Sequence, residues 1–141
     1  MRASVAGWGV VLVLVGGLTA SAQTAHEVTA SALNVRASAG GRLLGTVHRG
    51  ARFVVSTSRS GWSQIDWQGH RGWVATRYLT RVSATGVKVT PDALNVRSGP
   101  GTSASRIGIV RRNQIYVRLE TRSGWERIQF DDRTAWVAGW L

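Results

Sequence analysis

One pentapeptide, Ala-Leu-Asn-Val-Arg, occurs twice in the chain, at Ala32–Arg36 and at Ala93–Arg97. Each copy lies near the start of a longer repeat, Val28–Leu79 and Val89–Leu141. When two residues are inserted in the second early loop and one is removed near the end, 20 of the 52 positions are identical. A repeat of this length indicates two small units that share one fold.

Short alternating runs and turn residues fill each unit, without a helical period. The spacing from Ile65 to Trp73 is eight residues, and it recurs from Ile128 to Trp136. Because polar turn residues lie in between, we predict a tight β-hairpin there. Before this hairpin lie Phe53–Val55 in the first copy and Tyr116–Arg118 in the second. A shift of one residue in strand pairing would reverse which of their side chains face inward, and we place Val54 and Val117 in the core.

Each unit is so small that a few large side chains must supply most of its core. Tryptophan buries about 150–250 Å² of surface, and four tryptophans recur at matched positions. The framework residues that we predict are Trp62, Trp73, Trp125, Trp136, Val35, Val96, Ile65 and Ile128.

The first 22 residues have the pattern of a secretory signal. Arg2 precedes the apolar run Val5–Leu18, and Ala20–Ala22 supplies small residues before a cleavage site. We therefore predict a mature chain that begins at Gln23 and has no stable membrane span, because the run is shorter than the roughly 20 residues that cross a bilayer. The alternative is an uncleaved anchor, which would be helical.

The composition limits the possible binding partners and excludes cysteine chemistry. A formal charge of +11 favours anionic partners such as nucleic acid, cell wall or lipid head groups, although it also serves solubility. The chain has no cysteine, which excludes disulfides, thiolate metal sites and a thiol nucleophile.

The repeat also argues against catalysis. His48 corresponds to Arg111 and His70 to Arg133, so both positions tolerate a permanent cation, which is neither a metal ligand nor a general base. No pair of acidic residues recurs in both copies. We predict no enzyme, no cofactor and no metal site.

The two repeats resemble the bacterial SH3-like (SH3b) domain. The residues that carry the resemblance are Leu94–Thr102, Ile107-Gly108, Gly124-Trp125, Ile128, Trp136-Val137 and Trp140-Leu141, with Leu33–Arg36, Leu44-Gly45, Gly61-Trp62, Ile65, Gly72–Val74 and Tyr78-Leu79 in the first copy. This resemblance implies an all-β chain of two tandem small barrels. We place the signal segment at residues 1–22, the barrels at 24–81 and 88–141, and a linker at 82–87.

Shared arginines and aromatic residues at strand ends are the candidate ligand-binding residues, because guanidinium groups pair with anions and aromatic faces stack on sugars. They are Arg36, Arg97, Arg49, Arg112, Arg59, Arg122, Trp67, Tyr78, Tyr116 and Trp140. An alternative holds for two pairs of aromatic residues. Trp67 and Phe130 would point into the barrels with Ile65 and Ile128, and Tyr78 and Trp140 would close them.

The resemblance implies a non-catalytic, exported module, periplasmic or extracellular, that binds peptidoglycan or a related wall ligand. Its partners would be a wall polymer or an envelope protein, with a separate wall hydrolase among the latter. The alternative is an interaction or scaffold module for an envelope protein or peptide. Export argues against nucleic acid as the partner.

Overall fold

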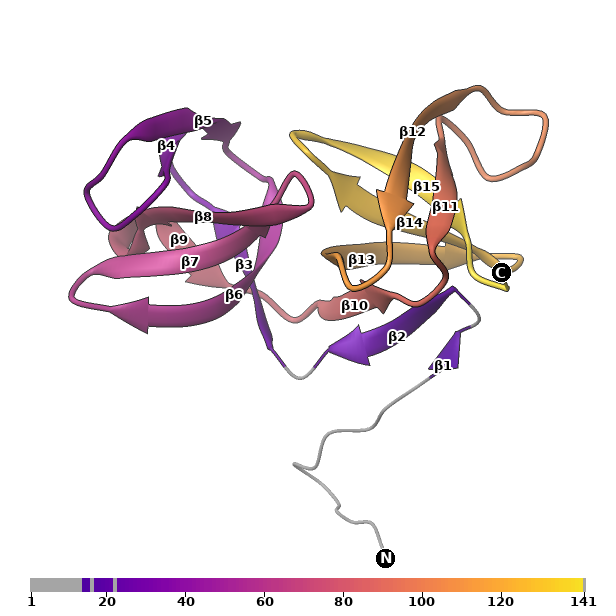
Figure 1. Cartoon of the computed structure of the whole chain (residues 1–141), viewed down its shortest axis with the longest axis horizontal. Coiled ribbons are helices and arrows are strands. Elements are labelled where there is room, and N and C mark those ends of the chain that lie inside the picture. Colours follow the sequence, from indigo (N-terminus) through magenta and orange to yellow (C-terminus); the bar gives the residue numbers. More distant parts are fainter. Residues whose placement is uncertain (1–13, 16, 22, 141) are drawn as a thin grey trace, which may run out of the picture.

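The computed structural model describes residues 14–15, 17–21 and 23–140, and it confirms an all-β chain with two similar barrels (Figure 1). The first barrel contains β3 (Thr24–Val28), β4 (Ala32–Arg36), β5 (Leu43–His48), β6 (Arg52–Arg59), β7 (Trp62–Trp67), β8 (His70–Ala75), the 3-10 turn η1 (Thr76–Tyr78) and β9 (Leu79–Arg81). Its antiparallel strands lie in the order β5-β4-β8-β7-β6-β3-β9.

The second barrel repeats this order with one replacement. Its own strands are β10 (Thr85–Val89), β11 (Ala93–Arg97), β12 (Arg106–Arg111), β13 (Ile115–Arg122), β14 (Trp125–Phe130) and β15 (Arg133–Ala138). They run in the order β12-β11-β15-β14-β13-β10, and the sheet then continues through β2 (Leu18–Ser21) and β1 (Leu14–Val15). The place that β9 takes in the first barrel therefore belongs to β2 in the second (Figure 1).

The described part of the N-terminal segment is thus a pair of short strands, which corrects the helix expected for a retained segment. The carboxyl end of the segment continues the sheet of the second barrel, so strand pairing satisfies its backbone. Residues 1–13, 16 and 22 of the proposed signal lie outside the described residues. In the part of the chain that the structure describes, no helix has the length and apolar character to cross a membrane.

Each barrel has its own apolar core. Val35 and Ile65 are fully buried in the first, and Val96 and Ile128 are fully buried in the second. A glycine in the facing strand makes room for a ring in each core. A Cβ atom on Gly45 would lie 2.8 Å from Trp67, and one on Gly108 would lie 2.7 Å from Phe130. The ring and the glycine therefore recur together.

The two barrels pack against each other through a third apolar cluster, formed by Ala25, Val54, Ile115 and Val117. The placement of Val54 and Val117 in the barrel cores was therefore wrong. Phe53 and Tyr116, one residue earlier, point into the cores instead, because successive strand residues face opposite sides. The connection between the barrels is also shorter than predicted. β10 begins at Thr85, so only residues 82–84 separate it from β9.

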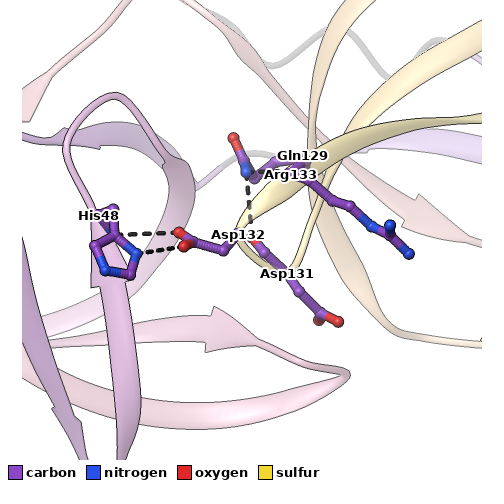
Figure 2. Close-up of polar contacts among 5 residues, drawn as sticks. All are labelled: His48, Gln129, Asp131, Asp132 and Arg133. Carbon is purple, nitrogen blue, oxygen red and sulfur yellow. Dashed lines mark hydrogen bonds and ion pairs between the residues drawn. The ribbon is translucent and has the colours of Figure 1, made fainter.

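Polar contacts extend this interface (Figure 2). The backbone N–H of His48 donates to Asp132 Oδ1 over 3.1 Å, and the His48 ring pairs with the other oxygen of the same carboxylate. Gln129 donates to the carbonyl groups of Asp131 and Arg133, so it holds the turn that carries Asp132. The orientation of one barrel relative to the other is fixed by these contacts and by the apolar cluster.

Candidate functional site: two outer aromatic faces

Trp73, Trp125 and Trp136 are buried, as predicted for framework residues, whereas Trp62 is only half-buried. All four lie apart from the main core cluster of their barrel. In the second hairpin, Ile128 is paired with Ala135 and both face the core, whereas Trp125 is paired with Ala138. Trp125, Trp136 and Ala138 form a cluster of their own. Because side chains alternate along a strand, residues an odd number of positions from Ile128 must face outward.

The first hairpin follows the same rule. Trp62 is paired with Ala75, and Trp73 is adjacent to the fully buried Val74. We call Arg59, Trp62 and Trp73 the first aromatic face, and Arg122, Trp125, Trp136 and Trp140 the second aromatic face.

An arginine covers one tryptophan on each face. The guanidinium carbon of Arg59 lies 5.2 Å from the ring centre of Trp73, and that of Arg122 lies 5.2 Å from the ring centre of Trp136. At this distance a cation is attracted to the face of the ring by about 0.5–1 kcal/mol at an exposed site. The tryptophans are thereby buried to 8% and 7% exposure although they lie outside the cores.

The turn before each hairpin brings these residues together. Ser60 and Gly61 have φ of 50° and 83°, and Ser123 and Gly124 have φ of 50° and 85°. Two successive residues with positive φ form the tight turn that matches strand twist. Arg59 is consequently paired with Trp62, and Arg122 with Trp125.

The arginine of the repeated pentapeptide has a local structural contact. Arg36 donates to the carbonyl of Gly41 and Arg97 to that of Ala104, each over 3.0 Å. These hydrogen bonds hold the loop after β4 in the first barrel, and the loop after β11 in the second, against the barrel. These two candidates therefore shape the rim of each aromatic face.

The two faces differ in how far that loop covers them. In the first barrel the loop lies close to Trp62, since a Cβ atom on Gly40 would be 3.7 Å from its ring. In the second barrel a cleft of about 50 Å³ remains open, lined by Asn95, Arg97, Thr102, Trp125, Ala138 and Trp140. The second aromatic face therefore carries the cleft and the exposed Trp140, although its Trp125 is more buried than Trp62 of the first face.

Trp140 is the exposed aromatic residue of this cleft, with 54% of its surface accessible. Its ring stands at 90° to that of Trp125, with 5.0 Å between the ring centres. This T-shaped contact holds the Trp140 ring against Trp125 while about half of the residue stays exposed. The cleft combines an aromatic surface with a guanidinium, an amide and a hydroxyl, the groups that recognise sugars, amides and carboxylates.

Charge around the second face is partly neutralised. Arg122 is paired with Glu120, with 2.6 Å between Nη2 and Oε2, and Arg127 contacts the other oxygen. The hydrogen bond from Arg122 lowers the pKa of the Glu120 carboxyl. Arg122 is therefore held by a carboxylate and by the Trp136 ring together.

The remaining candidates are distributed elsewhere. Arg112 forms an ion pair with Asp92 at 2.8 Å, and Arg49 lies in a groove between the barrels beside His48. Tyr78 is 36% exposed and is covered by Arg77.

Two candidates are core residues. Trp67 is 6% exposed and packs in the first core, which agrees with the alternative interpretation of its position. Tyr116 is 9% exposed, its hydroxyl donates to Gln114, and burial raises its pKa well above the usual range. Their rings are therefore not available as binding surfaces.

Sequence reasoning missed three residues of the open cleft, namely Asn95, Thr102 and Ala138. Asn95 could have been found from the pentapeptide, because it alternates with the buried Leu94 and Val96 and so faces outward. For Thr102 no sequence signal exists, since it belongs to a loop. Among the described residues, no group of three or more His, Asp or Glu side chains could hold a metal ion.

The comparison with protein families matches both units. The model of the bacterial SH3 domain covers residues 31–80 and 92–141. The chain belongs to the bacterial SH3 domain family. Among curated proteins, the SH3 pair is 31% identical over 137 residues to the "Putative N-acetylmuramoyl-L-alanine amidase YrvJ" of Bacillus subtilis (strain 168), with 85% of this chain and 26% of that protein covered. The chain thus spans about a quarter of this relative.

The comparison with solved structures found matches with TM-scores below 0.5, among them two proteins whose names contain NlpC. NlpC1 from Trichomonas vaginalis has a TM-score of 0.41 and 14% identity, with 95% of this chain and 50% of that chain covered. An NlpC/P60 family protein from Bacillus cereus has a TM-score of 0.34 and 13% identity, with 82% and 54% covered.

Proposed function

We propose that this bacterial SH3 pair is an exported, non-catalytic module that binds peptidoglycan or a related wall ligand, and that the second aromatic face makes the contact. The observation that carries the proposal is the open cleft with the exposed Trp140 ring beside Arg97 and Asn95. The relative's printed name, an amidase of N-acetylmuramoyl-L-alanine, supports a wall ligand. In this proposal, a wall hydrolase would be a separate partner protein.

The chemistry of the cleft fits a wall fragment. A pyranose ring can stack on the exposed face of Trp140, as aromatic surfaces commonly do with apolar sugar faces. The Asn95 amide can exchange hydrogen bonds with an acetamido group, because it offers both a donor and an acceptor. The Arg97 guanidinium already donates to Ala104, and its remaining donors can face a carboxylate of a stem peptide.

A pull-down on purified peptidoglycan sacculi tests the proposal. The full chain carries a formal charge of +11, so screened attraction alone must be separated from recognition. We expect retention to survive ~0.3 M salt, where the Debye length is well under 10 Å. Loss of all retention at that salt, or no retention at low salt, contradicts wall recognition.

The matched variants Trp140→Ala and Tyr78→Ala locate the contact. They remove corresponding aromatic residues from the two barrels, and both are partly exposed, so neither should unfold the protein. We expect Trp140→Ala to weaken retention about tenfold, which is about 1.4 kcal/mol, and Tyr78→Ala to leave it almost unchanged. Equal losses would mean that the second face is not the principal contact.

A further inference from the structure

The edge of β10 accepts a strand from a distant part of the chain. In the first barrel, β3 lies between β6 and β9, with Val28 paired with Leu79. In the second barrel, β10 lies between β13 and β2, with Val89 paired with Leu18. Since Val89 is the repeat equivalent of Val28, the two leucines hold the same structural position.

The agreement extends to the next residue and its register. Thr80 is paired with Glu27, and Thr19 is paired with Lys88, the repeat equivalent of Glu27. Two segments of unrelated position therefore present the same Leu-Thr pair to the same edge. In both barrels the edge holds a leucine opposite a fully buried valine, Val28 or Val89.

The Leu18 side chain and backbone hydrogen bonds of Gly17 hold this segment against the second barrel. Leu18 is fully buried in the second core together with Val87 and Val89. The N–H of Thr90 donates to the carbonyl of Gly17, and the N–H of Gly17 donates to the carbonyl of Gly139, both over 2.9 Å. The position thus requires an extended backbone and one aliphatic side chain.

Processing after Ala22, which the sequence predicts, would remove this strand from the barrel. The edge of β10 would then lose its backbone partners, and the place of the Leu18 side chain beside Val89 would become open. An unpaired strand edge next to an apolar opening is a site for strand addition by another chain.

We propose that the edge of β10 is a strand-acceptor site for an extended segment of a protein partner that carries an aliphatic residue at the position of Leu18. Before processing, the N-terminal segment occupies the site itself. After processing, the partner takes its place. The site adjoins the second aromatic face at Gly139, whose carbonyl accepts a hydrogen bond from Gly17, and it adds a protein contact to the proposed wall contact.

Hydrogen exchange at two amides tests the proposal. Thr90 donates toward β2, whereas Val89 donates to Gln114 on the opposite side, so the Lys88 amide also faces β2. We compare the full chain, produced without export, with a chain that begins at Gln23. The Lys88 and Thr90 amides should exchange at least about tenfold faster in the shorter chain, because their acceptor strand is absent.

A synthetic peptide with the sequence of residues 14–21 serves as the probe. It should restore protection of both amides in the shorter chain, and the same peptide with Leu18→Asp should not. In the shorter chain, Lys88→Pro should abolish peptide binding while the barrel persists, since proline is tolerated at a strand edge but cannot donate to an added strand.

Equal exchange of both amides in the two chains would overturn the proposal, and so would equal binding of the two peptides. If the shorter chain does not fold its second barrel, the full chain with Leu18→Asp replaces it. That variant should lose protection at Lys88 and Thr90 selectively, and unchanged protection there would overturn the proposal. No sacculi are used, so the outcome is independent of wall binding.

Discussion

The two aromatic faces are built from the same parts but differ in access. Each has an arginine 5.2 Å from a tryptophan ring and a tight turn that sets the pair. On the first face the loop approaches Trp62, whereas on the second a cleft stays open beside Trp140. The shared parts therefore belong to the framework of both barrels, and we expect the residues that differ to determine which face binds the proposed ligand.

Because the two faces share these parts, equivalent substitutions should lower the stability of the two barrels by similar amounts. Trp73→Ala and Trp136→Ala should each destabilise their own barrel by about 3–5 kcal/mol, because each removes a ring that is at most 8% exposed. Denaturant melts followed by near-UV circular dichroism measure the loss. Trp→Phe at either position is the control and should retain most of the stability. A melt unchanged from wild type in either alanine variant would show that the outer cluster does not support its hairpin.

Filling the cleft should separate binding from stability. Thr102 is exposed in the loop that borders the cleft, and Ala39 is exposed in the loop of the first barrel. Thr102→Phe should reduce retention on sacculi several-fold, up to about 1 kcal/mol, and Ala39→Phe should not. Both should melt like wild type. A stronger effect from Ala39→Phe would reverse the assignment of the binding face.

The positions of Asp66 and Gln129 correspond, and they provide a third test. Gln129 donates to two carbonyl groups, whereas Asp66 has a buried oxygen without a hydrogen-bond partner among the described residues. Asp66→Gln should therefore stabilise the first barrel by about 1 kcal/mol near neutral pH. Thermal melts at several pH values measure this effect.

The sign of the pH dependence follows from the same carboxyl. Burial raises the pKa of Asp66 above its usual 3.8, and Arg71 opposes this effect. Its contribution to stability is present below the unfolded pKa and is lost as the pH rises through the folded pKa. The loss should be absent in Asp66→Gln. Equal pH profiles in the two proteins would contradict the pKa shift.

The smallest effect is expected at Glu120. The hydrogen bond from Arg122 lowers its pKa below the usual 4.5, so its contribution is present above that value and is lost as the pH falls through the folded pKa. Glu120→Gln should weaken the acid sensitivity of the second barrel slightly, because the pair is exposed. The first barrel has Thr57 at the equivalent position and serves as the internal reference. Melting temperatures measured over a series of acidic pH values test this, and a large difference between Glu120→Gln and the wild type would contradict the expectation of a small effect.

The alternation of side chains along each strand could have predicted which side of the barrel the tryptophans face. Trp62 is three residues from Ile65, so the two cannot share a face of one strand. The same rule separates Trp136 from Val137. The small size of each domain suggested that the four recurring tryptophans belong to the cores, but they lie on the opposite side of their strands, where an arginine covers Trp73 in one barrel and Trp136 in the other.

By itself, the sequence determined the strands, the tight turns and the two barrels, because these depend on local patterns that occur in both repeats. Only the tertiary structure decided that Val54 and Val117 join the two barrels, that Asp132 meets His48, and that Leu18 closes the second barrel. These contacts join residues that are distant in the chain. No local period encodes such contacts, since they depend on which surfaces remain open after each barrel has formed.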